Sequence, residues 1–227
     1  MKQKALLAQE LAAEEKKRFK AVIEAEENER SRIARELHDG LGQMLSTARL
    51  NVSGLEEVII SGEKQSLDKS LKIIDDACVE VRNISHNMMP NALVRLGLVP
   101  ALKELVDSIN SSKLLQIKYD TNLEGSLGKS MDITIYRILQ EILNNMIRHS
   151  GANHIDLDMH KEGDYLTLRI NDNGKGFDTE KLKEARGLGW KNIFSRVSMM
   201  DGTIQLDSIP DKGTMVYINI KLKDESI

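Results

Sequence analysis

A helical apolar period and two glycines occur together in the stretch Glu29-Arg30-Ser31-Arg32-Ile33-Ala34-Arg35-Glu36-Leu37-His38-Asp39-Gly40-Leu41-Gly42-Gln43. Each glycine inside a helix costs roughly 1 kcal/mol relative to alanine, so another requirement favours bare backbone here. Gly42 follows His38 by four residues and therefore lies beside the imidazole on one helical face. The stretch predicts a helix that keeps space open next to His38 for a bulky group.

His38 and its neighbours have the composition of a reactive centre. A neutral imidazole is a nucleophile, and it needs a partner at its other ring nitrogen to fix the tautomer and take a proton. Asp39 is the candidate partner, although adjacent side chains of an α-helix point about 100° apart. Gln43 shares a face with Asp39, and a carboxylate beside an amide can position a water. The alternative interpretation is an ordinary histidine on a solvated helix face.

Amphipathic helices flank this stretch. Apolar residues recur every three to four positions over residues 33–59 and again over 67–88, and Pro90 ends the second run. Two such helices form an antiparallel hairpin, and one hairpin cannot cover both apolar stripes. We therefore predict an all-α hairpin at 30–90 that forms a four-helix bundle as a homodimer. Residues 1–29 are rich in Ala, Glu and Lys, which predicts a helical linker or coiled-coil entry.

The rest of the chain, 91–227, mixes helical and strand periods. Helices are predicted at 98–109, 133–147 and 191–200, a strand at 116–121, and β-hairpins at 155–170 and 204–222. Helices and hairpins segregated in this way predict an α+β sandwich, with one helical layer on one mixed sheet.

The helix predicted from residue 133 has a polar face that is suited to phosphate chemistry. No G-x-x-x-x-G-K-[ST] motif occurs, so phosphates would have to be held without a P-loop. Asn145 offers a hard oxygen ligand for Mg²⁺, and Arg148 can pair with phosphate. Glu141 and His149 share this face. The alternative is a solvated helix face with no ligand.

Two glycine-containing segments follow. At a strand end, residues 171–177 read NDNGKGF, where glycines allow the backbone to approach a ligand and Asp172 can accept a hydrogen bond from an adenine amino group. Gly187-Leu188-Gly189 precedes a predicted helix, whose free N–H groups can face phosphate. The polar residues 177–186 have the composition of a lid. A plain turn and a plain linker are the alternatives.

Composition excludes several other classes. The formal net charge is −3 and aromatic residues make up 4%, which disfavours nucleic-acid binding. Cys78 is the one cysteine, so no internal disulfide can form. It falls on an apolar stripe, which predicts a buried side chain. No run of about 18 apolar residues occurs, so the sequence predicts no membrane span.

In this order and spacing, the motifs resemble the sensor histidine kinases of two-component systems, in particular the nitrate-sensor type. The resemblance covers about residues 30–222. It rests on His38-Asp39, Gln43, Gln140-Glu141, Asn145, Arg148-His149, Asp172, Gly174, Gly176-Phe177, Gly187-Leu188-Gly189 and Gly213-Thr214. It implies a dimerisation and phosphoacceptor hairpin followed by an ATP-binding domain of the GHKL class.

The resemblance also implies a role for each matching residue. His38 would be phosphorylated from ATP, and Asp39 would be the base that activates it. Gln43 would orient a water that removes phosphate from a response regulator. Asn145 would bind Mg²⁺, and Glu141 would lie close to the γ-phosphate.

The remaining expectations concern adenine, partners and location. The resemblance implies that Asp172 recognises adenine, with Thr214 beside it. The other expected nucleotide-binding residues are Arg148, His149, Gly174, Gly176, Gly187, Leu188, Gly189 and Lys191. The implied partners are the receiver domain of a response regulator, which accepts the phosphate on an aspartate, and a second copy of the chain. We expect the chain to be the cytoplasmic part of a longer, membrane-anchored sensor.

The residues alone leave two other classes of protein possible. Chaperone-type or gyrase-type ATPases and serine kinases share the GHKL domain, but they need no phosphoacceptor hairpin. A coiled-coil dimer that binds ATP only as a structural ligand would tolerate the loss of both His38 and Asp39.

Overall fold

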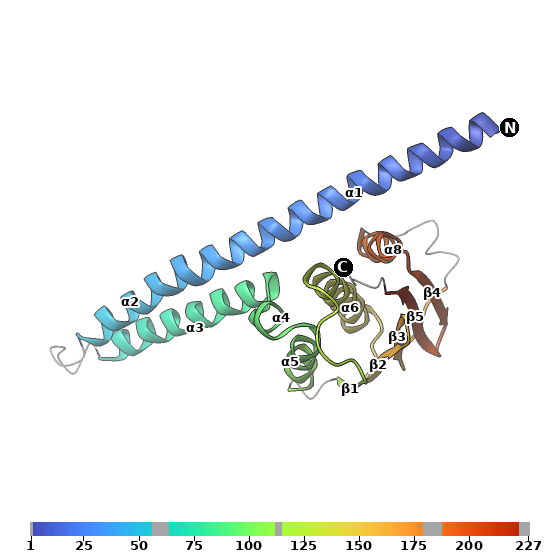
Figure 1. Cartoon of the computed structure of the whole chain (residues 1–227). Coiled ribbons are helices and arrows are strands. Elements are labelled where there is room, and N and C mark those ends of the chain that lie inside the picture. The colour runs from blue at the N-terminus through green and yellow to red at the C-terminus, as the bar shows by residue number, and fades with distance from the viewer. Residues whose placement is uncertain (1, 56–63, 112–114, 179–187, 223–227) are drawn as a thin grey trace. The chain divides into compact units, whose positions relative to one another are not determined.

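The computed structural model describes residues 2–55, 64–111, 115–178 and 188–222 of the chain (Figure 1). The chain divides into two compact units, Met1–Asn91 and Ala92–Ile227, and each is described by itself. The first helix continues through residue 29 without a break. The division into domains at 1–29, 30–90 and 91–227 stays a prediction.

The first unit is a helical hairpin, as predicted. Its elements are α1 (Lys2–Glu36), a π-helical segment (Leu37–Leu41), α2 (Gly42–Ser53) and α3 (Lys64–Met88). The helix α3 runs back along α2 and the end of α1 (Figure 1). The Ser85 hydroxyl donates to the Ala34 carbonyl oxygen at 2.9 Å, and an ion pair joins Arg49 to Asp75. These two contacts hold the hairpin together at separate levels.

The apolar stripes of the hairpin are only partly covered within one chain. Ile23, Ala34, Leu67 and Cys78 are buried, which confirms the prediction for the cysteine. Other large apolar side chains of α2 and α3 remain exposed: Met44, Leu50, Ile73, Val79 and Ile84. The single hairpin therefore leaves apolar surface that a further helix layer can bury. In the described part of the chain, no helix is both long and apolar enough to cross a membrane.

The second unit is an α+β sandwich, as predicted. Its helices are α4 (Asn91–Leu96), α5 (Leu98–Asn110), α6 (Lys129–His149) and α8 (Leu188–Met199). Its strands are β1 (Gln116–Thr121), β2 (His154–Glu162), β3 (Tyr165–Asp172), β4 (Thr203–Ile209) and β5 (Gly213–Lys221). The last helix begins three residues earlier than the predicted start at Lys191, so Gly189 lies inside its first turn.

The sheet has the order β1-β2-β3-β5-β4, and β1 is parallel to β2 while the other neighbours are antiparallel. Along β2 and β3, every second residue is buried, as expected for a sheet with one covered face. Figure 1 shows α5, α6 and α8 on that covered side. The inward residues of the strands include Ile155, Leu157, Met159, Leu166, Leu168, Ile170, Val216 and Ile218, all 0% exposed.

The helix α6 forms the centre of the helical layer. Ile135, Ile138, Leu139 and Ile142 are each 0% exposed, and their three- and four-residue spacing makes one continuous stripe against the sheet. Burial of such a side chain contributes about 1.5–3 kcal/mol. This stripe fixes the rotation of α6 about its axis and therefore the direction in which the opposite, polar face points.

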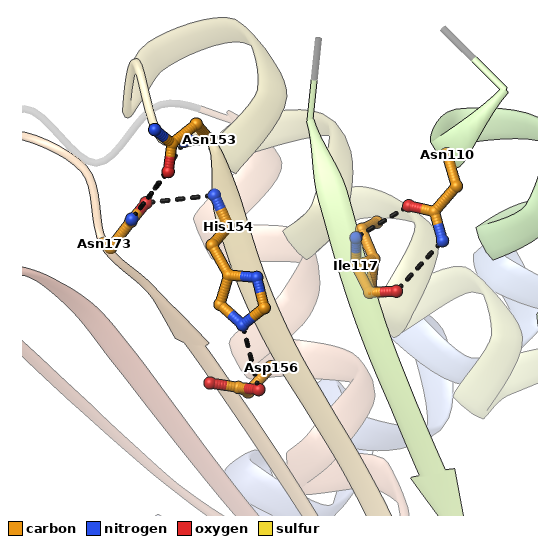
Figure 2. Close-up of polar contacts among 6 residues, drawn as sticks. All are labelled: Asn110, Ile117, Asn153, His154, Asp156 and Asn173. Carbon is orange, nitrogen blue, oxygen red and sulfur yellow. Dashed lines mark hydrogen bonds and ion pairs between the residues drawn. The ribbon is translucent and has the colours of Figure 1, made fainter. Parts of the chain in front are cut away.

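Side-chain amides complete the backbone hydrogen bonding at the sheet's margins (Figure 2). Asn110 at the end of α5 accepts from the Ile117 N–H at 2.7 Å and donates to the Ile117 carbonyl at 3.0 Å. Asn173 accepts from the N–H groups of Asn153 and His154 at 3.1 and 3.0 Å. The first pair satisfies a residue of the edge strand β1, which would otherwise offer free backbone groups.

We expect Asn110→Ala to lower the free energy of unfolding by about 1–3 kcal/mol, because the Ile117 backbone groups lose both partners. Urea denaturation followed by circular dichroism measures this change. The matched control is Asn144→Ala, at an exposed position of α6. Equal urea midpoints for the two variants would contradict the assigned role of Asn110.

Candidate functional site

A cavity of about 380 Å³ opens in the second unit between α6, the start of α8 and the ends of β3 and β5. Of the residues predicted to bind nucleotide, it is lined by Asn145, His149, Asp172, Gly176, Gly189 and Thr214. Residues that are more than sixty positions apart in the sequence therefore line the same cavity. A cavity of this size, with few polar groups and an apolar wall, is typical of a small-molecule site.

Asp172 is the polar centre of the cavity. It ends β3, is 1% exposed, and its Oδ1 accepts a hydrogen bond from the Gly174 N–H at 2.7 Å. Its Oδ2 is buried and has no hydrogen-bond partner among the described residues. A buried acceptor without a partner is rare in proteins and costly, so a ligand donor is the natural partner here. An exocyclic amino group, as in adenine, has the required chemistry.

Close backbone packing holds this carboxylate in place. A Cβ on Gly174 would lie 2.5 Å from the Ser150 carbonyl oxygen and 2.7 Å from Asp172 Oδ1. Gly176 has a φ of +57°, and a Cβ there would collide with the Ile209 backbone. Because the Lys175 N–H also donates to the Ser150 carbonyl at 2.8 Å, the loop is fixed against the end of α6. Glycine is required at both positions for this turn to form.

Asn145 and Glu141 form a second polar group on α6. The Asn145 amide nitrogen is buried without a partner in the described part of the chain. A Cβ on Gly189 would clash with Glu141 Oε1 and would lie 3.5 Å from Asn145 Nδ2. Amide nitrogen and oxygen exchange by a half-turn of the side chain, so Asn145 can present its oxygen to a cation. The donor set therefore fits Mg²⁺, which binds to one or two protein oxygens together with phosphates and water.

Other predicted residues lie elsewhere. Arg148 and Lys191 are exposed and do not line the cavity. Gly174 acts through its N–H bond to Asp172 and does not form the cavity wall. Leu188 begins α8, while Gly187 and most of the predicted lid, residues 179–186, fall outside the described residues. These roles stay predictions.

The structure adds residues that the sequence analysis missed. Ser208 accepts from the Phe177 N–H at 2.9 Å, donates to the Gly213 carbonyl at 3.1 Å and lies 3.0 Å from the Thr214 hydroxyl. It thus ties the loop after Asp172 to β5. Trp190 forms part of the cavity wall, and its ring centroid is 6.4 Å from that of Phe194. A motif search cannot find Ser208, because its relation to Asp172 arises only from the pairing of β3, β5 and β4. Trp190 reaches the cavity from the first turn of α8.

In the first unit, His38 and Asp39 meet directly. Nδ1 of His38 is 2.9 Å from Oδ1 of Asp39, and the two side chains are 61% and 68% exposed. They lie in the π-helical segment, where the Gly42 N–H bonds to the Leu37 carbonyl, five residues back. The wider turn departs from α-helical geometry, and such bulges are frequent at functional sites. Since a carboxylate only accepts, Nδ1 is the donor, and in a neutral imidazole Nε2 then carries the free lone pair.

A groove of about 540 Å³ lies beside this pair. One wall contains His38, Gly42 and Gln43 with Ser46 and Thr47, and the other contains Cys78 and Arg82 of α3. A Cβ on Gly40 would meet nothing within 4 Å, and one on Gly42 only the Leu37 carbonyl at 3.6 Å. Packing within this unit therefore does not require glycine at either position. The free space next to His38 agrees with room for an incoming group.

The chain thus combines a helical hairpin, in which a histidine is paired with a carboxylate, with an α+β domain that contains a small-molecule cavity. The family model described as "Histidine kinase" matches residues 29–93. The model described as "Histidine kinase-, DNA gyrase B-, and HSP90-like ATPase" matches residues 131–224. The chain belongs to the sensor histidine kinases, as the motifs of its sequence indicated.

Individual proteins agree with this assignment. The sensor protein VraS of Staphylococcus haemolyticus is 32% identical over 201 residues, which covers 88% of this chain and 57% of that protein. VraS of Staphylococcus aureus is 31% identical over 204 residues, with the same coverage. The chain thus spans little more than half the length of these curated relatives. The histidine kinase domain of the Erythrobacter litoralis blue-light activated kinase shares the fold, with a TM-score of 0.50 over 86% of this chain and 94% of that domain, at 17% identity.

We expect Asp172→Asn to weaken ATP binding. Loss of a hydrogen bond to a charged group costs about 1.5–3 kcal/mol, which corresponds to about a tenfold to hundredfold loss of affinity. Trp190 is the one tryptophan of the sequence and lines the cavity, so its fluorescence reports binding. Asp164→Asn, in the exposed turn between β2 and β3, is the matched control. An unchanged affinity of the Asp172→Asn variant for ATP would contradict a role of Asp172 in nucleotide binding.

Proposed function

We propose that this chain is the kinase core of a two-component sensor, which transfers the γ-phosphate of ATP to His38 and then to an aspartate of a response regulator. The observation that carries the proposal is the hydrogen bond between His38 Nδ1 and Asp39 Oδ1 at 2.9 Å, which leaves Nε2 exposed beside an open groove. Family membership supports the same reaction.

The first step is attack by Nε2 of His38 on the γ-phosphorus. The Nε2 lone pair forms the N–P bond, and the bond from the γ-phosphorus to the β–γ bridging oxygen breaks, so that ADP leaves with the electron pair. Positive charge then develops on the ring. Asp39 stabilises this charge through Nδ1 and can accept the Nδ1 proton. Because the pair is solvent-exposed, Nε2 is accessible to an incoming nucleotide.

The nucleotide site supplies binding and orientation. Asp172 would accept a hydrogen bond from adenine, and the backbone at Gly176, which lines the cavity, would lie against the ring. Asn145 would hold Mg²⁺, which neutralises phosphate charge when bound, and Glu141 beside it would lie close to the γ-phosphate. Arg82 offers a guanidinium in the groove of His38, and a guanidinium suits a phosphoryl group at that position.

A second copy of the chain and a response regulator would complete the system. The exposed apolar residues Met44, Leu50, Ile73 and Val79 on α2 and α3 fit a four-helix bundle formed by two hairpins. The groove at His38 would receive the regulator's aspartate. Since the reaction consumes ATP, we place this part of the protein in the cytoplasm of the cell, as part of a membrane-anchored sensor.

We expect His38→Gln to abolish labelling by γ-labelled ATP while ATP binding persists, because only the nucleophile is lost. In the unchanged protein, the label should be acid-labile and base-stable, as for phosphohistidine. The matched control is His154→Gln, on the open face of the sheet, which should label normally. Label that survives in His38→Gln would favour another ATPase or kinase of the GHKL class.

We further propose that Gln43 orients the water that attacks the phosphorylated aspartate of the regulator. It lines the same groove as His38, but it does not contact the His38–Asp39 pair through any hydrogen bond among the described residues. Gln43→Ala should therefore slow dephosphorylation of the regulator at least about tenfold and leave autophosphorylation within about twofold. Parallel assays with phosphorylated regulator and with labelled ATP measure the two rates. Equal loss of both activities would contradict this division of roles.

A further inference from the structure

We propose that Asp120, Asp158 and His160 form a binding site for a divalent transition-metal ion of the Zn²⁺ class, separate from the nucleotide and histidine sites. One donor atom from each of these three residues lies within 4.8 Å of the donor atoms of the other two. Asp120 belongs to β1, and the other two residues belong to β2. We name these three residues the strand triad.

The strand triad follows from a pattern in β2. The residues His154-Ile155-Asp156-Leu157-Asp158-Met159-His160 alternate, and Ile155, Leu157 and Met159 point into the core at 0% exposure. The histidines and aspartates therefore share the open face of the sheet. Parallel pairing of β1 with β2 then sets Asp120 directly beside Asp158.

An ion pair alone does not explain this arrangement. Nε2 of His160 lies 3.3 Å from Oδ2 of Asp120, and this single contact involves only one of the two carboxylates. Asp158 adds a second carboxylate in register with the first, and like charges opposite each other destabilise a sheet. A cation bound by all three groups removes this repulsion. Arg169 of β3 is the register partner of Asp158 on the other side of β2, but the described residues contain no ion pair between them.

The backbone around the strand triad is held rigidly. The Thr121 hydroxyl donates to the Met159 carbonyl at 2.7 Å. Asn122 accepts from the Lys161 N–H at 2.7 Å and donates to the Lys161 carbonyl at 3.1 Å. These bonds continue the β1–β2 pairing past the end of β1, so the backbone that carries the three donors is positioned before any ion binds. Such preorganisation is what a metal site needs from its scaffold.

The donor set selects the class of ion. Imidazole suits Zn²⁺, Ni²⁺, Co²⁺ and Cu²⁺, whereas Mg²⁺ and Ca²⁺ prefer oxygen ligands alone. Three protein ligands on an exposed sheet face leave at least one position for water. The bound ion would cross-link the edge strand β1 to β2, and it would stabilise the folded chain by mass action.

The test is calorimetric titration of the whole chain with Zn²⁺, without nucleotide, in a His38→Gln background so that the phosphoacceptor imidazole does not contribute. We expect saturable binding that His160→Asn and Asp120→Asn each weaken by at least about tenfold. The matched control is His154→Asn, because His154 shares the strand and face but lies outside the strand triad, and its Nε2 is 3.2 Å from Asp156 Oδ1 (Figure 2). This control should bind Zn²⁺ as the background does.

Three results would overturn the proposal: no saturable binding, unchanged binding in His160→Asn, or an equal loss in His154→Asn. The last result would mean that the strand face as a whole attracts cations. Retained ATP binding, followed by Trp190 fluorescence, confirms that each variant is folded. Asp120 is exposed and His154 and His160 are partly exposed, so loss of the fold is not expected.

Discussion

The rotation of α6 about its own axis is the constraint on which the nucleotide site depends. Ile135, Ile138, Leu139 and Ile142 are fully buried against the sheet, and turning the helix by one residue would expose part of this stripe. With the stripe fixed, the 3.6-residue period directs Glu141 and Asn145 toward the start of α8. Burial of the apolar core thus fixes the position of polar groups that have no hydrogen-bond partner among the described residues, such as the Asn145 amide nitrogen.

The same core holds Asp172 in an unfavourable place. A carboxylate at 1% exposure with one oxygen unpaired is costly to fold. The cost is tolerated because Ile170, two residues earlier on β3, is buried and fixes the strand register, so Asp172 cannot turn outward. A one-residue slip would move Ile170 into solvent. Binding groups in this unit are therefore held in place by the packing of their neighbours along the same element.

The sequence predicts those elements whose residue pattern lies within one continuous segment, and it does not predict contacts between distant segments. The periods of α5, α6 and the two hairpins are local, so their existence was predicted within a few residues, and Cys78 was correctly expected to be buried. The parallel pairing of β1 with β2 was not predicted, because it joins segments on either side of α6. Ser208 was missed for the same reason, because its contacts depend on the pairing of distant strands. Trp190 was missed because its place in the cavity wall depends on the packing of α8.

The glycines of the two sites differ in whether packing requires them. At Gly174 and Gly176, a side chain would strike the backbone of Ser150 or Ile209, so the fold itself requires glycine there. At Gly40 and Gly42, a side chain would meet nothing closer than 3.6 Å, although glycine weakens a helix at both positions. A helix-weakening residue that packing within the unit does not require indicates selection by something outside that unit. Because His38 and Gly42 line the same groove, the approach of another protein surface to Nε2 is the simplest physical reason for these glycines.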